Sequence, residues 1–322
     1  MALNSRQRWT PADIPDQRGR TAVITGANRG LGFETAKLLA EHGATVVLAC
    51  RNADNAAHAA ARITASVPNA TVRTLRLDLG SLASIRHAAD RLRADHPRLD
   101  LLINNAGGVR PRYALTEDGF ESTVATNHLG PFAFTGLILD RLLTVPGSRI
   151  VTVSSIGHRR GTINLDDLHF ARGYRYQHAY FQSKLANLMF TYELQRRLAA
   201  AGAPTIAVAA HPGNARTQFG REMPVWVRIG MRPELAMLTW WLMQSPQKGA
   251  LAAVRASVDP DAHGGDYYGP PGRAQFTGYP TRVESAARSH DTTTQHRLWQ
   301  ESERLTGVTY TVGRSLSPQN RS

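Results

Sequence analysis

The chain has 322 residues, of which 42% are hydrophobic and 20% charged, and its formal net charge is +13. This composition is typical of a globular protein and excludes a collagen-like or wholly disordered chain. Cys50 is the only cysteine, which excludes an intrachain disulfide and fits a reducing compartment, so we expect a cytoplasmic protein.

The N-terminal residues 1–18 form a segment with two proline breaks, at Pro11 and Pro15. They contain no continuous apolar stretch, so neither a signal peptide nor a transmembrane span is predicted there. We interpret the segment as a polar arm. At the other end, residues 310–322 are mainly polar and are predicted to be a disordered tail.

Short apolar runs alternate with helical patterns along most of the chain. Strands are predicted for residues 21–25, 44–50, 71–77, 99–103, 149–153 and 205–210. Helices are predicted for residues 31–41, for the alanine-rich stretch after the second strand, and for 81–96, 120–143 and 180–200. The pair Gly130-Pro131 is expected to disturb the middle of the fourth helix. Further on, we predict a short helix after Lys248, a loop over 264–280 and a last helix over 295–305.

This alternation predicts a doubly wound α/β fold, with a parallel sheet covered by helices on both faces. We assign residues 19–309 to a single Rossmann-type domain. Residues 214–245 break the alternation, because they mix Pro, Gly and Arg with many apolar and aromatic residues. We predict that they form a substrate-binding lid; packing against the domain or a partner, and contact with a membrane surface, remain alternatives.

A glycine-rich turn follows the first strand and opens the first helix, with the sequence Thr25-Gly-Ala-Asn-Arg-Gly-Leu-Gly32. Gly26 permits the tight turn, while Gly30 and Gly32 allow a pyrophosphate and the helix to approach the backbone closely. A strand before the turn and a helix after it are the context that such a motif requires. The sequence therefore predicts a dinucleotide site.

The charge near the second strand predicts which dinucleotide binds. An NAD site usually places a carboxylate at the end of that strand, whereas this chain has Cys50-Arg-Asn52. Arg29, inside the glycine turn, is a second cation for the same region. Because guanidinium groups bind phosphate in a bidentate manner, Arg29 and Arg51 predict NADP(H) as the cofactor.

Further polar residues follow the third and fourth strands. Asp78 is placed to accept from the adenine amino group, and an N-cap for the next helix is an alternative role. Asn104 and Gly107 are expected to line the cofactor pocket. Asn105 is expected to hold backbone between strands.

Tyr180 and Lys184 lie one helical turn apart, so their side chains can share a helix face. A free tyrosine is a weak acid near neutral pH, but a neighbouring ammonium group and an oxidised nicotinamide would favour its phenolate. Tyr180 is therefore the candidate proton donor for carbonyl reduction, and Lys184 would also bind the nicotinamide ribose. Ser155, just after the fifth strand, would donate to the substrate oxygen. Asn127 would hold a water that links Lys184 to solvent.

These motifs in this order resemble the short-chain dehydrogenase/reductase family, and in particular its retinol dehydrogenase-like branch. The resemblance covers about residues 19–309 and includes Asn104-Asn-Ala-Gly107, Asn127-His-Leu-Gly130, Tyr180-x-x-x-Lys184 and His211-Pro-Gly213. It implies a catalytic tetrad of Asn127, Ser155, Tyr180 and Lys184. It also implies a set of cofactor-binding residues: Gly26, Asn28, Arg29, Gly30, Leu31, Gly32, Arg51, Asp78, Leu79, Asn105, Ala106, Gly107, Tyr180, Lys184, Pro212, Gly213 and Thr217.

The expected activity is hydride transfer between NADP(H) and a carbonyl or alcohol. The apolar segment 214–245 favours a small hydrophobic ketone or aldehyde as substrate. A non-catalytic NADPH-binding regulator on the same fold is the alternative function, since a fold alone does not establish chemistry. The basic residues are scattered, so no nucleic-acid partner is expected. No metal site is predicted, because the histidines form no cluster with ligand spacing. The resemblance leaves open whether the chain is a monomer or a homo-oligomer.

Overall fold

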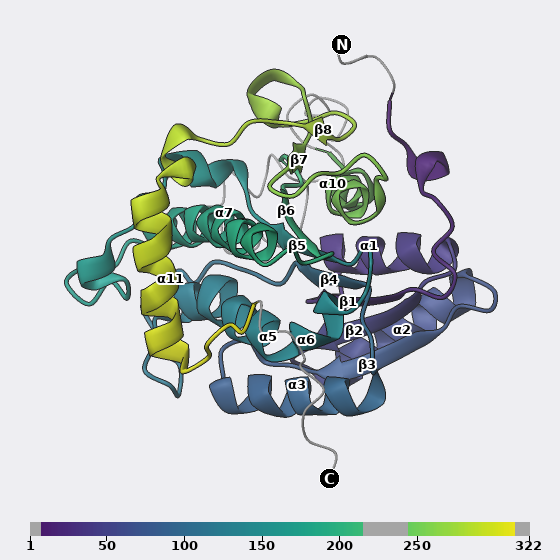
Figure 1. The fold of residues 1–322 in the computed structure, drawn as a ribbon, viewed down its shortest axis with the longest axis horizontal. Helices are drawn as coiled ribbons and strands as arrows, with labels where there is room; N and C mark the ends of the chain where they lie inside the picture. Colours follow the sequence, from purple (N-terminus) through teal and green to yellow (C-terminus); the bar gives the residue numbers. More distant parts are fainter. Residues whose placement is uncertain (1–7, 215–243, 313–322) are drawn as a thin grey trace.

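Eight strands form one twisted sheet in the order β3-β2-β1-β4-β5-β6-β7-β8 (Figure 1). The structure is a computed structural model that describes residues 8–214 and 244–312. Neighbouring strands run parallel from β3 to β7, and β8 is antiparallel to β7. The strands are β1 (Thr21–Thr25), β2 (Thr45–Cys50), β3 (Val72–Arg76), β4 (Leu101–Asn104), β5 (Arg149–Val153), β6 (Ile206–Ala210), β7 (Tyr267–Gly269) and β8 (Thr281–Arg282).

Helices cover both faces of the sheet, as the doubly wound prediction required (Figure 1). The α-helices are α1 (Gly30–Glu41), α2 (Ala53–Ser66), α3 (Leu82–Asp95), α4 (Ser122–Val124), α5 (Gly130–Ile138), α6 (Asp140–Leu143), α7 (Tyr176–Ala200), α10 (Pro246–Val258) and α11 (Thr292–Thr306). None of the described helices is both long enough and apolar enough to cross a bilayer.

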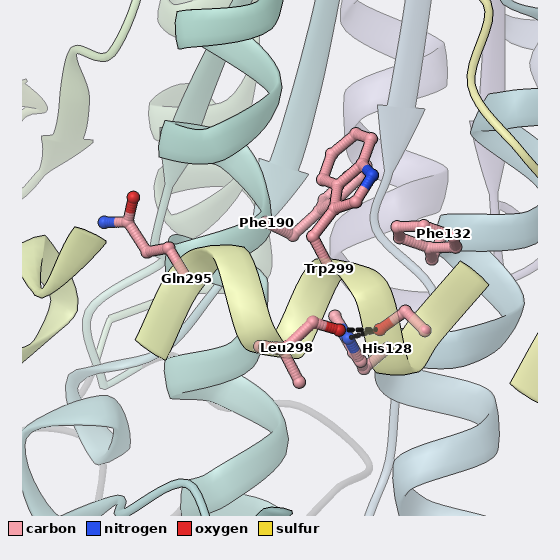
Figure 2. A pocket seen from close by; sticks show the side chains of 7 residues that line it. His128, Phe132, Phe190, Gln295, Leu298 and Trp299 are labelled. Atoms are coloured by element: carbon pink, nitrogen blue, oxygen red, sulfur yellow. Dashed lines mark hydrogen bonds between the residues drawn. The ribbon is translucent and has the colours of Figure 1, made fainter. Parts of the chain in front are cut away.

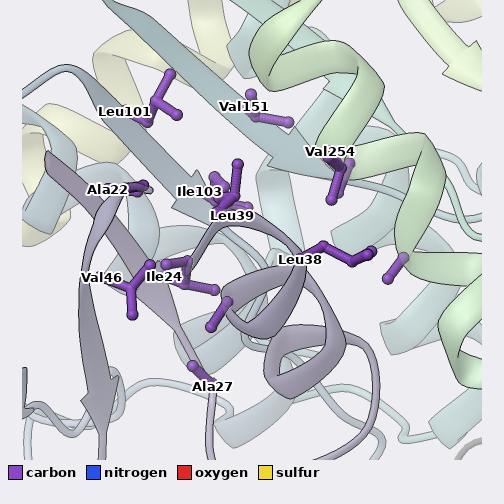
Figure 3. Close-up of a cluster of buried hydrophobic side chains, with 14 of the residues drawn as sticks. Ala22, Ile24, Ala27, Leu38, Leu39, Val46, Leu101, Ile103, Val151 and Val254 are labelled. Atoms are coloured by element: carbon purple, nitrogen blue, oxygen red, sulfur yellow. The ribbon is translucent and has the colours of Figure 1, made fainter. Parts of the chain in front are cut away.

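Alternating strand residues feed two separate cores, because successive side chains of a strand point to opposite faces. On one face, Ile24 and Val151 pack with α1, α2 and α10, and Figure 3 shows this cluster with Leu39 and Val254. On the other face, Val23 and neighbours pack with α3, α5 and α7. The strand order reverses between β1 and β4, and ligands in such sheets bind beyond the carboxyl ends of the strands at this point.

Both chain ends are less simple than predicted. Trp9 and Ile14 of the N-terminal arm are buried in the core beside α1 and α10, so the prediction of a polar arm over residues 1–18 was wrong for this part. The arm packs because Trp9 brings a large apolar surface that burial stabilises. Tyr310 is also buried, and its hydroxyl donates to the Phe132 carbonyl at 2.6 Å. The predicted tail therefore cannot begin at residue 310.

The predicted helix over 120–143 consists of four pieces. A π-helix, η2 (Ala125–Leu129), separates α4 from α5, and α6 follows. Pro131 is the second residue of α5, so its missing N–H falls where the π-helix ends and the α-helix begins. The expected disturbance at Gly130-Pro131 is thus present, and it takes the form of a wide helical turn just before this pair. Such turns are frequent at functional sites.

The predicted lid, residues 214–245, lies almost entirely outside the described residues and stays a prediction.

Candidate active site

The glycine-rich turn connects β1 to α1 and leaves room for a ligand. Gly26 and Gly30 have φ angles of +68° and +57°, which favour glycine. A Cβ atom on Gly30 would meet nothing within 4 Å, whereas one on Gly32 would collide with the Asn105 amide and the Gly26 carbonyl. The turn is therefore open at Gly30 and closely packed at Gly32, as a pyrophosphate site needs.

The N-terminus of α1 faces this open side. Its N-cap residue is Arg29, whose side chain makes no capping hydrogen bond. The first-turn N–H groups of Gly30, Leu31 and Gly32 are thus uncapped by the N-cap side chain, and the helix dipole adds partial positive charge there. These residues fit an anionic dinucleotide phosphate.

The end of β2 lies directly under the turn. Burial raises the pKa of the Cys50 thiol, and the backbone N–H groups of Ala27 and Asn28 in the turn lower it in part. Arg51 follows at the surface and is exposed, as is Arg29. The two arginines therefore lie at the ends of β1 and β2, which pair directly.

Asp78 and Leu79 follow β3. The Asp78 carboxylate accepts the Gly80 N–H at 2.9 Å, and Ser81 is the residue that caps α3. The alternative of Asp78 as the helix N-cap was wrong, because the chain turns once more before α3 begins. Leu79 is buried in the core, and a Cβ on Gly130 would collide with its carbonyl.

The turn after β4 separates the two asparagines. Asn104 was expected to line the cofactor pocket, and this was wrong: it is buried and donates to Thr135 Oγ1 of α5 at 2.9 Å. In β4, Asn104 lies on the same face as Leu102, whose side chain belongs to the core formed with α3, α5 and α7. Asn105 donates to the Thr25 carbonyl at 2.8 Å, while Thr25 Oγ1 accepts the N–H groups of Asn105 and Ala106. This confirms that Asn105 links two strands.

After β6, Pro212 is half-buried and Gly213 has a φ of +64°. A Cβ on Gly213 would collide with the Phe276 carbonyl, so glycine is required where these two segments meet. Thr217 lies outside the described residues.

Tyr180 and Ser155 meet at the carboxyl end of β5. Their side chains are hydrogen-bonded to each other. Burial raises the pKa of Tyr180, and the hydrogen bond with Ser155 lowers it in part. Ser155 also caps the 3-10 helix η3 (Ile156–Arg160), since its Oγ accepts the Gly157 N–H at 3.1 Å.

Lys184 is buried one turn further along α7. Its Nζ donates to the Val153 carbonyl at 3.1 Å and lies 5.8 Å from the centre of the Tyr180 ring. Burial lowers the pKa of the ammonium group to about 8. The Nζ atom would lie 3.2 Å from a Cβ on Gly107, so a side chain at Gly107 would crowd it.

Asn127 sits in the π-helix and is fully buried. Its Oδ1 accepts the Gly108 N–H at 2.8 Å, and its Nδ2 donates to the Gly108 carbonyl and to Ser183 Oγ, both at 2.9 Å. These contacts fix the loop after β4 against α7. The oxygen would lie 3.1 Å from a Cβ on Gly107. Asn127 and Lys184 thus approach the same glycine from two elements.

Two neighbours escaped the sequence-based prediction. Ser183 accepts from Asn127 and donates to the Tyr180 carbonyl at 2.8 Å, so it joins the π-helix to the turn that carries Tyr180. A serine directly before Lys184 was the available signal. His158 is the second neighbour, and its side chain is completely buried beside Ser155.

Comparisons with known proteins identify the family of the chain. The profile described as short chain dehydrogenase matches residues 20–227. Retinol dehydrogenase 13 of Homo sapiens is 39% identical over 298 residues, which cover 92% of this chain and 86% of that protein. Dehydrogenase/reductase SDR family member 13 of Bos taurus is also 39% identical over 298 residues, covering 90% of this chain and 74% of the relative.

Solved structures share the fold. The crystal structure of an uncharacterized protein from Mycobacterium Paratuberculosis has 41% sequence identity and a TM-score of 0.79, covering 95% of this chain and 100% of that chain. The RhlG/NADP active-site complex of Pseudomonas aeruginosa has 24% identity and a TM-score of 0.62, covering 78% of this chain and 94% of that chain.

The chain belongs to the short-chain dehydrogenase/reductase family, whose members are oxidoreductases that bind a nicotinamide cofactor. Within the family it belongs to the retinol dehydrogenase-like branch.

Proposed function

We propose that the protein is an NADP(H)-dependent oxidoreductase that reduces hydrophobic ketones or aldehydes, or oxidises the corresponding alcohols, with Tyr180 as the acid/base group. The observation that carries this proposal is the meeting of Tyr180, Ser155 and Lys184 at the carboxyl end of β5, on the same edge of the parallel sheet as the glycine-rich turn after β1. Hydride transfer needs these groups at the edge where the dinucleotide turn lies.

Each side chain has a distinct part in the proposed reaction. A bound nicotinamide would supply the hydride. Ser155 donates a hydrogen bond to the carbonyl oxygen, and Tyr180 donates its proton to the oxygen as negative charge develops there. Lys184 keeps the positive charge of its ammonium below a pH of about 8, which favours the phenolate left on Tyr180.

The proposed reaction is tested by NADPH oxidation with a panel of hydrophobic aldehydes and ketones. Retinoids belong in the panel because relatives bear the name retinol dehydrogenase. Tyr180→Phe removes only the hydroxyl, so turnover should fall at least about 100-fold while NADPH binding persists. Equal turnover by wild type and Tyr180→Phe would contradict the role of Tyr180. Tight NADPH binding without turnover of any compound would favour the non-catalytic regulator.

The proposed cofactor choice rests on Arg29 and Arg51, both exposed at the ends of β1 and β2. Arg51→Ala removes one guanidinium group that would bind the 2′-phosphate. We expect the NADPH Kd to rise about 10-fold or more with little change for NADH, because a charge-assisted bond to phosphate contributes roughly 1.5–3 kcal/mol. Titration of intrinsic fluorescence measures both values. An unchanged ratio of the two Kd values would contradict the preference for NADP(H).

A further inference from the structure

His158 lies three residues after Ser155 and is completely buried. Its Nδ1 lies 2.6 Å from the Ser155 carbonyl oxygen, and the same oxygen accepts the His158 backbone N–H at 3.0 Å. The carbonyl of the serine is therefore held by two contacts from one residue. Its side-chain hydroxyl accepts the Gly157 N–H at 3.1 Å and is the group that meets Tyr180.

The other ring nitrogen of His158 fixes the protonation of the ring. Nε2 lies 3.0 Å from the backbone N of Ala286, which can only donate. Nε2 must therefore accept, and the proton of the neutral imidazole must be on Nδ1, which donates to the Ser155 carbonyl. Burial lowers the pKa of His158 to about 4, so the ring is neutral at physiological pH. In an imidazolium, the Nε2–H group would face the backbone N–H of Ala286, and two donors would repel each other.

The segment behind Ala286 gives this contact a firm support. Arg288 donates to the Gly161 carbonyl at 2.8 Å and so binds the end of the η3 turn a second time. Ser285 is hydrogen-bonded to the Tyr192 hydroxyl of α7 at 2.8 Å. Residues 285–288 thus connect the turn after Ser155 with the helix that carries Tyr180.

The η3 turn has no free space on its Tyr180 side. A Cβ on Gly157 would lie 3.3 Å from a ring carbon of Tyr180 and 2.9 Å from one of Phe181. A Cβ on Gly161 would collide with the Phe181 carbonyl. Because the turn lies directly against α7, a small shift of η3 changes the distance between the Ser155 hydroxyl and the Tyr180 phenol.

We propose that His158 is a positioning residue that holds Ser155 in hydrogen-bonding distance of Tyr180, through its Nδ1–H to the Ser155 carbonyl and its Nε2 to the Ala286 N–H. This inference deepens the proposed function and rests on it. A displacement of about 1 Å at a reacting group can cost on the order of 100-fold in rate, so the contact matters for kcat rather than for cofactor binding.

Two substitutions separate the contacts of the ring. The amide of His158→Asn can take the place of Nδ1 and donate to the Ser155 carbonyl, whereas that of His158→Gln reaches the place of Nε2 and can accept from Ala286. We expect His158→Gln to lower kcat between about 10- and 100-fold with the NADPH Kd within about 2-fold of wild type. His158→Asn should recover a large part of this loss. His87→Gln is the matched control, because it makes the same replacement at an exposed histidine of α3 that contacts neither η3 nor α7.

The activity test has two outcomes when the wild type is active. Loss of kcat in His158→Gln and recovery in His158→Asn support the proposal, provided that His87→Gln keeps kcat. Equal kcat in all variants, or losses that follow only their thermal stability, would overturn it.

A second measurement distinguishes failure of this inference from failure of the proposed function. The ¹⁵N chemical shifts of the His158 ring, assigned by comparison with His158→Gln, report the tautomer without any substrate. A proton on Nε2 at pH 7 would overturn the inference even in an active enzyme. If no carbonyl compound is turned over, crystal structures of the wild type and His158→Gln decide: a displaced Ser155 hydroxyl supports positioning, and an unmoved one refutes it.

Discussion

Lys184 is a charged group that the fold keeps inside the protein. Its Nζ donates a hydrogen bond to the Val153 carbonyl, and burial lowers the pKa of its ammonium from 10.5 to about 8. The unfolded chain therefore binds more protons between pH 8 and pH 10.5, and stability rises with pH across that window. Below pH 8 the cost of burying the charge is fully present. The difference between the two pKa values corresponds to about 3 kcal/mol.

Replacing this lysine should make the protein more stable and less active. We expect Lys184→Met to raise the free energy of unfolding at pH 7 by roughly 1–3 kcal/mol, because methionine fills similar space without a charge. This difference in stability should shrink between pH 8 and pH 10, because Lys184 of the wild type loses its charge and the cost of burying that charge disappears. Urea unfolding at pH 7 and pH 9.5 measures both effects. A variant that is less stable than wild type at pH 7 would contradict this account.

Single residues differed in how well the sequence predicted them. Gly26, Gly32 and Asn105 were predictable, because a strand, a glycine turn and a helix define their local geometry. Asn104 was not, since its role depends on which face of β4 it occupies. His158 was missed because its partner, Ala286, is 128 residues away along the chain.

At the level of elements, α11 covers a face shared by α5 and α7. Figure 2 shows Trp299 of α11 beside Phe132 and Phe190, with His128 hydrogen-bonded to Ser302 at 3.0 Å. The ring centres of Trp299 lie 5.1 Å from Phe132 and 5.9 Å from Phe190. Because His128 directly follows Asn127, this cluster also supports the π-helix.

Substitutions of Trp299 test the contribution of this packing. Trp299 is 2% exposed, and its Nε1 has no hydrogen-bond partner among the described residues. Trp299→Ala should lower the free energy of unfolding by about 3–5 kcal/mol through the cavity that it leaves. Trp299→Phe should cost clearly less, because it keeps an aromatic ring and leaves no indole N–H buried. Denaturant unfolding measures both. Similar losses of unfolding free energy in the two variants would contradict this account and would mean that the indole N–H stabilises the fold.

The sequence predicted long, local elements better than short, non-local ones. β1 and β5 were predicted to the residue, since their apolar runs end in recognisable turns. Two strands were not predicted. β7 lies inside the segment 264–280, which was predicted to be a loop, and β8 follows directly after it. β7 has three residues and exists because Ala209 and Ala210 pair with it, a contact that no local pattern contains.

Three buried histidines determine how the whole molecule responds to acid. Burial lowers the pKa of His128 and His158 to about 4 and that of His211 to about 3, from 6.5. The unfolded chain binds more protons than the folded one below pH 6.5, so stability falls as the pH drops toward 4. The free energy of unfolding of a native protein is only about 5–15 kcal/mol, so such a decrease is large.

We therefore expect the free energy of unfolding to fall on the order of 5 kcal/mol between pH 7 and pH 5, and acid unfolding to begin above pH 4. Urea titrations at several pH values measure the slope. His128→Gln should give a shallower slope than wild type, because one of the three groups is gone. Equal stability at pH 7 and pH 5 would show that these rings are already protonated or exposed.

The architecture of the whole molecule was predictable because every motif agreed on one edge of one sheet. The burial of the two chain ends did not follow, since Trp9 and Tyr310 pack against elements formed far away in sequence.

The burial of Tyr310 has a consequence for the way in which the chain is made. Its hydroxyl reaches Phe132, and its ring lies 4.5 Å from that of Trp299, so residues near the C-terminus complete the core around α5 and α7. A ribosome hides the most recently joined residues in its exit tunnel. The aromatic face of these helices therefore stays uncovered on the ribosome until Trp299 and Tyr310 have left the tunnel. During that interval the nascent chain exposes an apolar surface, and we expect a chaperone to bind there.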